Sequence, residues 1–286
     1  MNDKKIQWHP AFAAAMDLEL NENRKDLEYN TEYNLNTKPL EVDLLIIKKN
    51  KGSQIVNEIG KLFRGNNIIE YKSPEDSLDI DMFYKVGAYA SLYKSYGKTV
   101  DERKADDITV SIFREMKPVG LFTYFKSHNI KITNPYSGIY YVMDSILFPT
   151  QIIVGRELDK KSHVWLRALS DQMQEQEMKE LLEEIEKLKL KLDKELADSV
   201  LEVSIRANWE IIKELRRDEN MCQALLEIME PEIDEIKNET KIKMIIELGQ
   251  EDGFSDAAII ERLQKKTGVP YEKAKAYLEQ YGKQLL

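Results

Sequence analysis

The sequence predicts an α/β protein in which a mixed β-sheet is flanked by helices and followed by an α-helical C-terminal region. Three short runs, 41–48, 67–72 and 108–114, are apolar and rich in β-branched residues, as strands buried on both faces are. Beyond residue 160 few strand signals remain, and apolar residues recur at spacings of three and four, which is typical of amphipathic helices. We therefore expect an N-terminal domain at 1–160 and an acidic helical tail at 161–286.

Turn and capping residues delimit the elements of the N-terminal domain. Pro10 suits the first turn of a helix, where its missing N–H costs nothing. Ser73–Pro74 stops a strand, and Gly97 ends a helix. In chain order we expect a helix at 10–21, an edge strand at 28–36, the strand at 41–48, a short helix at 55–64, the strand at 67–72, a helix at 78–96, the strand at 108–114, a helix at 118–127, a hairpin around 135–138 and a last strand at 151–157.

The tail is expected to consist of helices alone. A single amphipathic helix is predicted at 172–197, because its apolar residues share one face. That stripe consists of Leu181, Ile185, Leu188, Leu192 and Leu196. Further helices are expected at 199–217, 219–229 and 231–250, and a small helix pair at 255–284 begins at Ser255, a suitable N-cap.

The composition excludes several classes of protein. Cys222 is the single cysteine, so neither an intramolecular disulfide nor a cysteine-based zinc site can form. The three histidines share no ligand spacing, and we expect His163 to lie on the surface or in a loop. The glycines form no phosphate-binding loop, which argues against a P-loop ATPase or a dinucleotide-dependent enzyme.

Charge and hydropathy indicate where the protein works and what it binds. No apolar run reaches the roughly 18 residues that span a bilayer, so we expect a cytoplasmic protein with no membrane partner. The net charge is −9, and most of the excess lies in the tail, because the first 160 residues hold nearly equal numbers of acidic and basic groups. A nucleic-acid partner would therefore need a local basic groove on the N-terminal domain.

Asp43, Glu70 and Lys72 form the most informative group of polar residues. Alternate residues of a strand share a face, so Glu70 and Lys72 should project together from the end of a buried strand. Asp43 stands near the start of the preceding apolar strand. Two such carboxylates suit Mg²⁺, with Mn²⁺ as an alternative, and a neighbouring lysine can stabilise the charge that develops on a phosphate. The competing explanation is a salt bridge at a strand end, which contributes little.

The phrases PLEVDLLIIK and IIEYKSP resemble the PD-(D/E)XK nuclease superfamily, in particular its bacterial transposase-associated, recombination-promoting nuclease-like branch. The resemblance covers roughly residues 8–160, and EDGFSD in the tail is also similar to that branch. It implies a restriction-endonuclease-like fold and Mg²⁺-dependent cleavage of DNA. It further implies that Asp43 and Glu70 are metal ligands and that Lys72 is the catalytic lysine.

Three further residues are candidates for the same site. Glu19 shares a helix face with apolar residues, and the resemblance implies that it is the acid of the first helix, a catalytic residue and third metal ligand. A solvated acid at a helix end is the alternative. Lys85 and Tyr89 lie on one face of the helix at 78–96 and are candidates for substrate binding, because some family members carry Gln-x-x-x-Tyr there, although lysine replaces the glutamine in this chain. Packing and solvation are the simpler explanation of this pair.

Two functions compete on this sequence. The first is a Mg²⁺-dependent DNA endonuclease, which the family association links to DNA recombination or mobile elements. The alternative is a catalytically inactive protein of nuclease fold that acts as an interaction or homo-oligomerisation module through its C-terminal helices, a role suggested by the acidic tail and its apolar stripe.

Overall fold

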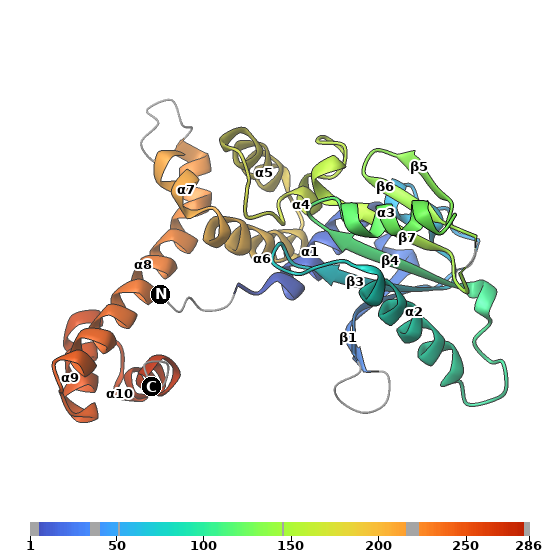
Figure 1. The fold of residues 1–286 in the computed structure, drawn as a ribbon. Helices are drawn as coiled ribbons and strands as arrows, with labels where there is room; N and C mark the ends of the chain where they lie inside the picture. The colour runs from blue at the N-terminus through green and yellow to red at the C-terminus, as the bar shows by residue number, and fades with distance from the viewer. Residues whose placement is uncertain (1–5, 35–40, 51, 145, 216–222, 283–286) are drawn as a thin grey trace. The chain divides into compact units, whose positions relative to one another are not determined.

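The computed structural model describes residues 6–34, 41–50, 52–144, 146–215 and 223–282. Contacts divide the chain into two compact units, one at Gln7–Lys213 and one that contains the helices beyond Glu214 (Figure 1). The predicted boundary at residue 160 thus falls inside the first unit. Cys222 and the last two residues of the strand predicted at 28–36 lie outside the described residues.

The first unit is built on a seven-stranded mixed sheet with the order β1-β2-β3-β4-β7-β6-β5. Its strands are β1 (Leu27–Asn34), β2 (Glu41–Lys48), β3 (Asn66–Lys72), β4 (Ile108–Arg114), β5 (Ile132–Tyr136), β6 (Ile139–Val142) and β7 (Thr150–Val154). β3, β4 and β7 run parallel to one another, and the remaining pairs are antiparallel. The predicted α/β class with a mixed sheet is confirmed, and β1 forms an edge as expected.

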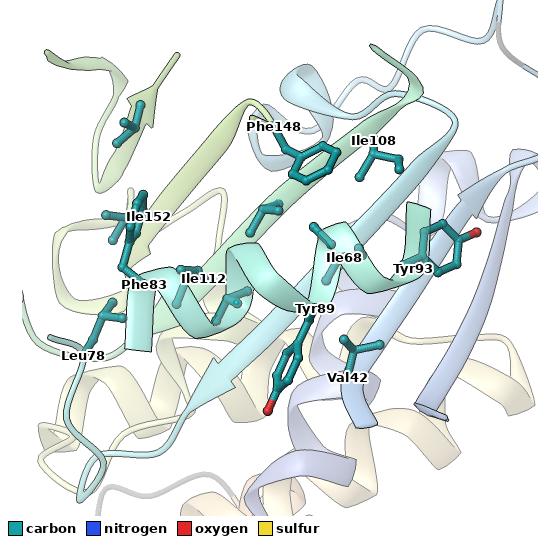
Figure 2. Packing of buried hydrophobic residues seen from close by; sticks show 14 of the residues in the cluster. Val42, Ile68, Leu78, Phe83, Tyr89, Tyr93, Ile108, Ile112, Phe148 and Ile152 are labelled. Atoms are coloured by element: carbon teal, nitrogen blue, oxygen red, sulfur yellow. The ribbon is translucent and has the colours of Figure 1, made fainter. Parts of the chain in front are cut away.

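Helices cover both faces of this sheet. α2 (Ile80–Ser95) connects the parallel strands β3 and β4, and it packs with α3 (Val119–Ser127) on one face. Figure 2 shows the resulting core, in which Phe83 and Tyr89 lie over Ile68 and Ile112. α1 (Trp8–Glu19) packs on the other face, where the Phe12 ring stacks on the ring of Tyr71, a residue of β3, with centroids 4.7 Å apart.

Two predicted elements are shorter than expected. The helix predicted at 55–64 is a 3-10 helix at Glu58–Leu62, which starts where the Asn57 side chain accepts a hydrogen bond from Ile59 N. The strand predicted at 151–157 ends at Val154 and continues as a 3-10 turn. In this turn Arg156 N donates to the carbonyl of Glu115 at 3.0 Å.

The single helix predicted at 172–197 is wrong, because two helices occupy this part of the chain. After α4 (Val164–Arg167), the chain forms α5 (Glu175–Lys187), α6 (Lys191–Ala207) and α7 (Trp209–Leu215). Extended backbone at Leu188 and Leu190 separates α5 from α6 and resets the helical phase. α6 then packs against α1, which joins this helical region to the sheet.

The second unit contains α8 (Gln223–Glu251), α9 (Asp256–Thr267) and α10 (Tyr271–Tyr281) around a core of its own. The predicted helix pair is confirmed, with Ser255 as the N-cap of α9 and Gly268 ending it at a φ of 73°. The separate helices predicted at 219–229 and 231–250 are wrong, since α8 continues through Pro231. No helix in the described part of the chain has both the length and the apolar character needed to cross a membrane.

Candidate active site

Asp43 lies where β2 and β3 stop pairing through their backbones. The backbone ladder of the two strands ends at Leu44 and Ile69. One residue further, Asp43 Oδ2 accepts a hydrogen bond of 2.8 Å from Tyr71 N. The carboxylate thus replaces a backbone acceptor of the ladder, which fixes the Asp43 side chain against β3 rather than against bulk solvent.

Glu70 and Lys72 project together from the carboxyl end of β3, as the alternation of the strand predicts. Lys72 Nζ lies 2.8 Å from Glu70 Oε1, and the two side chains are only 11% and 7% exposed. Ile68, two residues before Glu70, packs in the core beneath α2, so the pair lies on the α2 side of the sheet. The second oxygen, Glu70 Oε2, is buried and has no hydrogen-bond partner among the described residues.

The two carboxylates are held in an environment that disfavours their charges. Burial raises the pKa of Glu70, the charge of Asp43 raises it further, and Lys72 only partly compensates. Burial likewise raises the pKa of Asp43, against the hydrogen bond from Tyr71 N and the charge of Lys72. The nearby ammonium groups therefore only partly balance the buried Glu70 and the half-buried Asp43, and a bound cation would further favour the ionised form of both.

The donor set fits a hard divalent cation held by few protein ligands. In the described part of the chain, no cluster of three or more His, Cys, Asp or Glu side chains is arranged to hold a metal ion. Asp43 and Glu70 supply carboxylate oxygens, one of them unpartnered and buried. Mg²⁺ is commonly bound by one or two carboxylates, with water and substrate phosphate as the other ligands. These residues can therefore hold Mg²⁺ or Mn²⁺, and they do not form a closed zinc-type site.

The predicted substrate-binding pair on α2 separates into two roles. Lys85 is exposed, and its charge lowers the pKa of Glu70, so it borders the group of carboxylates. Tyr89 is 7% exposed and packs in the core between α2 and the sheet, where Figure 2 shows its ring. Lys85 Nζ lies 5.7 Å from the centroid of that ring. The packing role therefore accounts for Tyr89, whereas Lys85 adds positive charge beside the site.

His9 is a neighbour of the site that the sequence did not indicate. It lies in the first turn of α1, its Nε2 is 3.6 Å from Asp43 Oδ1, and its side chain is 49% exposed. Its ring also meets the edge of Tyr71 at a centroid distance of 5.6 Å. This contact joins a helix to a strand 34 residues later, and no local pattern in the sequence could have predicted it.

The structure does not bring Glu19 to this site. Glu19 ends α1, ten residues and therefore about 15 Å of helix beyond His9. It is 7% exposed. Its Oε2 lies 3.0 Å from His163 Nδ1 and accepts from Asn57 Nδ2 at 3.2 Å, and its Oε1 accepts from Leu166 N at 3.3 Å. The prediction of Glu19 as a third ligand is thus corrected: its carboxylate is used to fix α4 and the 3-10 helix at Glu58–Leu62 to the end of α1.

Of the two positions expected for His163, the surface is wrong, whereas a loop is right, because this residue lies outside the helices and strands as the N-cap of α4. His163 is fully buried, and its Nε2 lies 3.4 Å from Glu58 Oε2. Burial opposes its protonation, but the hydrogen bonds and charges of Glu19 and Glu58 outweigh this and raise the pKa of His163. The side chain bridges two carboxylates beside a polar hollow of about 380 Å³.

Comparison with known proteins identifies no relative of this chain: no family model matches, and no curated protein or solved structure gives a significant match. The function has to be inferred from the chain's own residues.

Proposed function

We propose that this protein is a Mg²⁺-dependent nuclease that hydrolyses phosphodiester bonds in DNA, with Asp43 and Glu70 as metal ligands and Lys72 as the catalytic lysine. The observation that carries the proposal is a buried carboxylate, Glu70, with one unpartnered oxygen, a lysine in contact with its other oxygen, and the half-buried Asp43 close enough to raise its pKa. Acids whose pKa is shifted by burial and by a specific charged neighbour are more frequent at functional sites than elsewhere.

The topology supports a restriction-endonuclease-like fold of the PD-(D/E)XK type. Three antiparallel strands lead into a parallel strand through a crossover helix, and the acids lie on β2 and β3 at the point where these two strands separate. The sequence phrases around Asp43 and Glu70 support the same assignment, and with it a role in DNA recombination or mobile elements. Mn²⁺ would serve in place of Mg²⁺, because it accepts the same oxygen ligands.

The chain's own residues have distinct tasks in this proposal. A bound divalent ion supplies Lewis acidity and lowers the pKa of a coordinated water. Asp43, oriented by Tyr71 N, and Glu70, oriented by Lys72, would hold the ion through the carboxylate oxygens that these contacts leave available. Lys72, held by Glu70, places a positive charge beside the phosphate as negative charge develops on it.

Cleavage of supercoiled plasmid in Mg²⁺ tests the proposal. Glu70→Gln and Lys72→Met should each lower the rate by roughly a thousandfold or more, because several kcal/mol of transition-state stabilisation would be lost. Unchanged cleavage by the Lys72→Met protein would contradict the assignment. No cleavage by the unaltered protein in Mg²⁺ or Mn²⁺ would contradict the activity itself.

The chain offers a matched control in its second Glu-x-Lys, at Glu115 and Lys117. These residues follow β4, but Glu115 Oε1 accepts from Arg156 Nε at 3.1 Å, and Lys117 Nζ donates to the Tyr140 hydroxyl at 2.6 Å. The two side chains thus have other partners, and Lys117→Met should keep the plasmid cleavage rate within about threefold. Loss of cleavage in both lysine variants would indicate a general effect of charge.

A second candidate function is an interaction module without catalysis. The second unit has its own core, and α8 exposes Met244 and Leu248, four residues apart on one face, at 56% and 43%. If this face mediates homo-oligomers, Leu248→Glu should lower the mass of the full chain in sedimentation experiments. An unchanged mass would remove this candidate interface.

A further inference from the structure

Arg114 ends β4 directly beside the candidate active site. Its Cα pairs with that of Lys72 across the parallel strands β3 and β4. Residues that pair in this way project from the same face of the sheet, and Ile112, two residues before Arg114, packs in the core beneath α2. The guanidinium of Arg114 and the ammonium of Lys72 therefore emerge side by side at the carboxyl ends of neighbouring strands.

The guanidinium is oriented without being neutralised. Arg114 Nε donates to the carbonyl of Asp76 at 3.1 Å, and its Nη1 donates to the carbonyl of Met116 at 2.9 Å. Both acceptors are uncharged. Within the described residues no carboxylate forms an ion pair with Arg114, whereas Arg156 pairs with both Glu115 and Glu177. Arg114 is thus a positive charge fixed by two carbonyls and not paired with any carboxylate in the described part of the chain.

We infer that Arg114 binds a phosphate of the nucleic-acid strand, next to the phosphate that is cleaved. The inference rests on the proposed nuclease function and adds a residue that contacts the substrate. Arginine presents a planar fork of donors that matches phosphate oxygens. Together with Lys72 and the exposed Lys85, Arg114 supplies local positive charge beside the candidate site of an otherwise acidic chain.

Arg64 is a matched control for this arginine. It precedes β3, at the opposite end of the strand from Lys72, and its Nη1 also donates to a backbone carbonyl, that of Asp106, at 2.6 Å. Arg64→Gln removes the same charge and the same type of hydrogen bond as Arg114→Gln, but away from the site. A difference between the two variants therefore reports position rather than net charge.

The experiment measures binding of a short fluorescent DNA duplex by anisotropy, in Mg²⁺ over a series of NaCl concentrations. The full chain carries Glu70→Gln so that the duplex stays intact. Adding Arg114→Gln should weaken binding about tenfold and lower the slope of log Kd against log salt by about one, because one phosphate contact is lost. Arg64→Gln should leave both quantities nearly unchanged. Arg114→Lys should keep the slope and recover part of the affinity, which excludes a folding defect as the cause.

The outcomes separate this inference from the function on which it rests. Plasmid cleavage by the unaltered protein, together with equal binding by the Arg114→Gln and Arg64→Gln variants, would overturn the role of Arg114 and leave the nuclease proposal standing. Absence of both DNA binding and cleavage in the unaltered protein would overturn both. A selective loss in the Arg114→Gln variant, with the slope restored by lysine, is the result we expect.

Discussion

The buried carboxylates of Glu19 and Glu70 each lie in a group of charged residues of the first unit, and the two groups differ in how their charges are balanced. At the end of α1, Glu19 accepts hydrogen bonds from Asn57 and Leu166 N and contacts His163, a group that can carry a positive charge. At the end of β3, Glu70 has a single side-chain partner and a buried oxygen without one among the described residues. The charge of Asp43 opposes ionisation of Glu70 further.

This difference is the reason that we propose a structural role for Glu19 and a functional role for Glu70. A buried polar network in which every member is satisfied rigidifies a fold, whereas an unsatisfied one costs stability and persists only where something else requires it. Glu115 shows that one unpartnered oxygen does not by itself indicate a functional carboxylate. Its Oε2 is also buried without a described partner, yet Arg156 and Ser170 hold its other oxygen. At Glu70 the unpartnered oxygen coincides with a second carboxylate.

The largest difference between the two groups is expected in the free energy of unfolding when one carboxylate in each is neutralised. Glu19→Gln should lower the free energy of unfolding by about 3 kcal/mol, because it removes the buried carboxylate that accepts from Asn57 and Leu166 N and contacts His163. Glu70→Gln should change it by less than about 1 kcal/mol, since loss of the ion pair with Lys72 is offset by relief of repulsion from Asp43. Urea unfolding of the two variants measures both values. Equal losses would remove the distinction between the groups.

A smaller effect is expected from divalent cations. Adding Mg²⁺ at ten to a hundred times its Kd should stabilise the protein by about 1–3 kcal/mol, which corresponds to a rise of a few degrees in Tm. Asp43→Asn should abolish that rise, while Glu19→Gln should keep it from a lower starting Tm. Calorimetric scans in EDTA and in Mg²⁺ provide the measurement. A rise that survives Asp43→Asn would place the ion elsewhere.

The strands and the arrangement of Glu70 and Lys72 could be predicted because they depend on local periodicity. β2, β3 and β4 match the predicted runs to within one residue, and the period of two puts Glu70 and Lys72 on one face. The predicted stripe at 172–197 failed for a related reason. A spacing of three and four continues through Leu188 to Leu192, but three residues of non-helical chain shift the phase, and Leu192 is 48% exposed.

The surroundings of Glu19 could not be predicted, because they depend on contacts between distant segments. His163 follows Glu19 by 144 residues, and Leu166 N follows it by 147. The apolar positions of α1 lie on several sides of the helix, so its pattern did not fix which way Glu19 points. The same reason explains why Arg114 was not expected at the site: its position depends on the parallel register of β3 and β4.

The smallest predicted effect is a dependence of stability on pH that arises from His163. The folded state raises the pKa of His163 above its ordinary value of 6.5, so it favours the protonated form. This contribution to stability is fully present below pH 6.5 and is lost as the pH rises through the folded-state pKa, because His163 then loses its proton in the folded state as well. The effect is small, since each pKa unit between the folded and unfolded states corresponds to about 1.4 kcal/mol. His163→Gln should remove this loss, so the difference between the two proteins in free energy of unfolding should shrink from pH 6 toward higher pH.

Urea unfolding across that range measures this difference, and Glu70→Gln serves as the control in which His163 and its partners are intact. A difference that stays constant with pH would show that His163 is buried in its neutral form, and the group around Glu19 would then be less fully balanced than its contacts indicate.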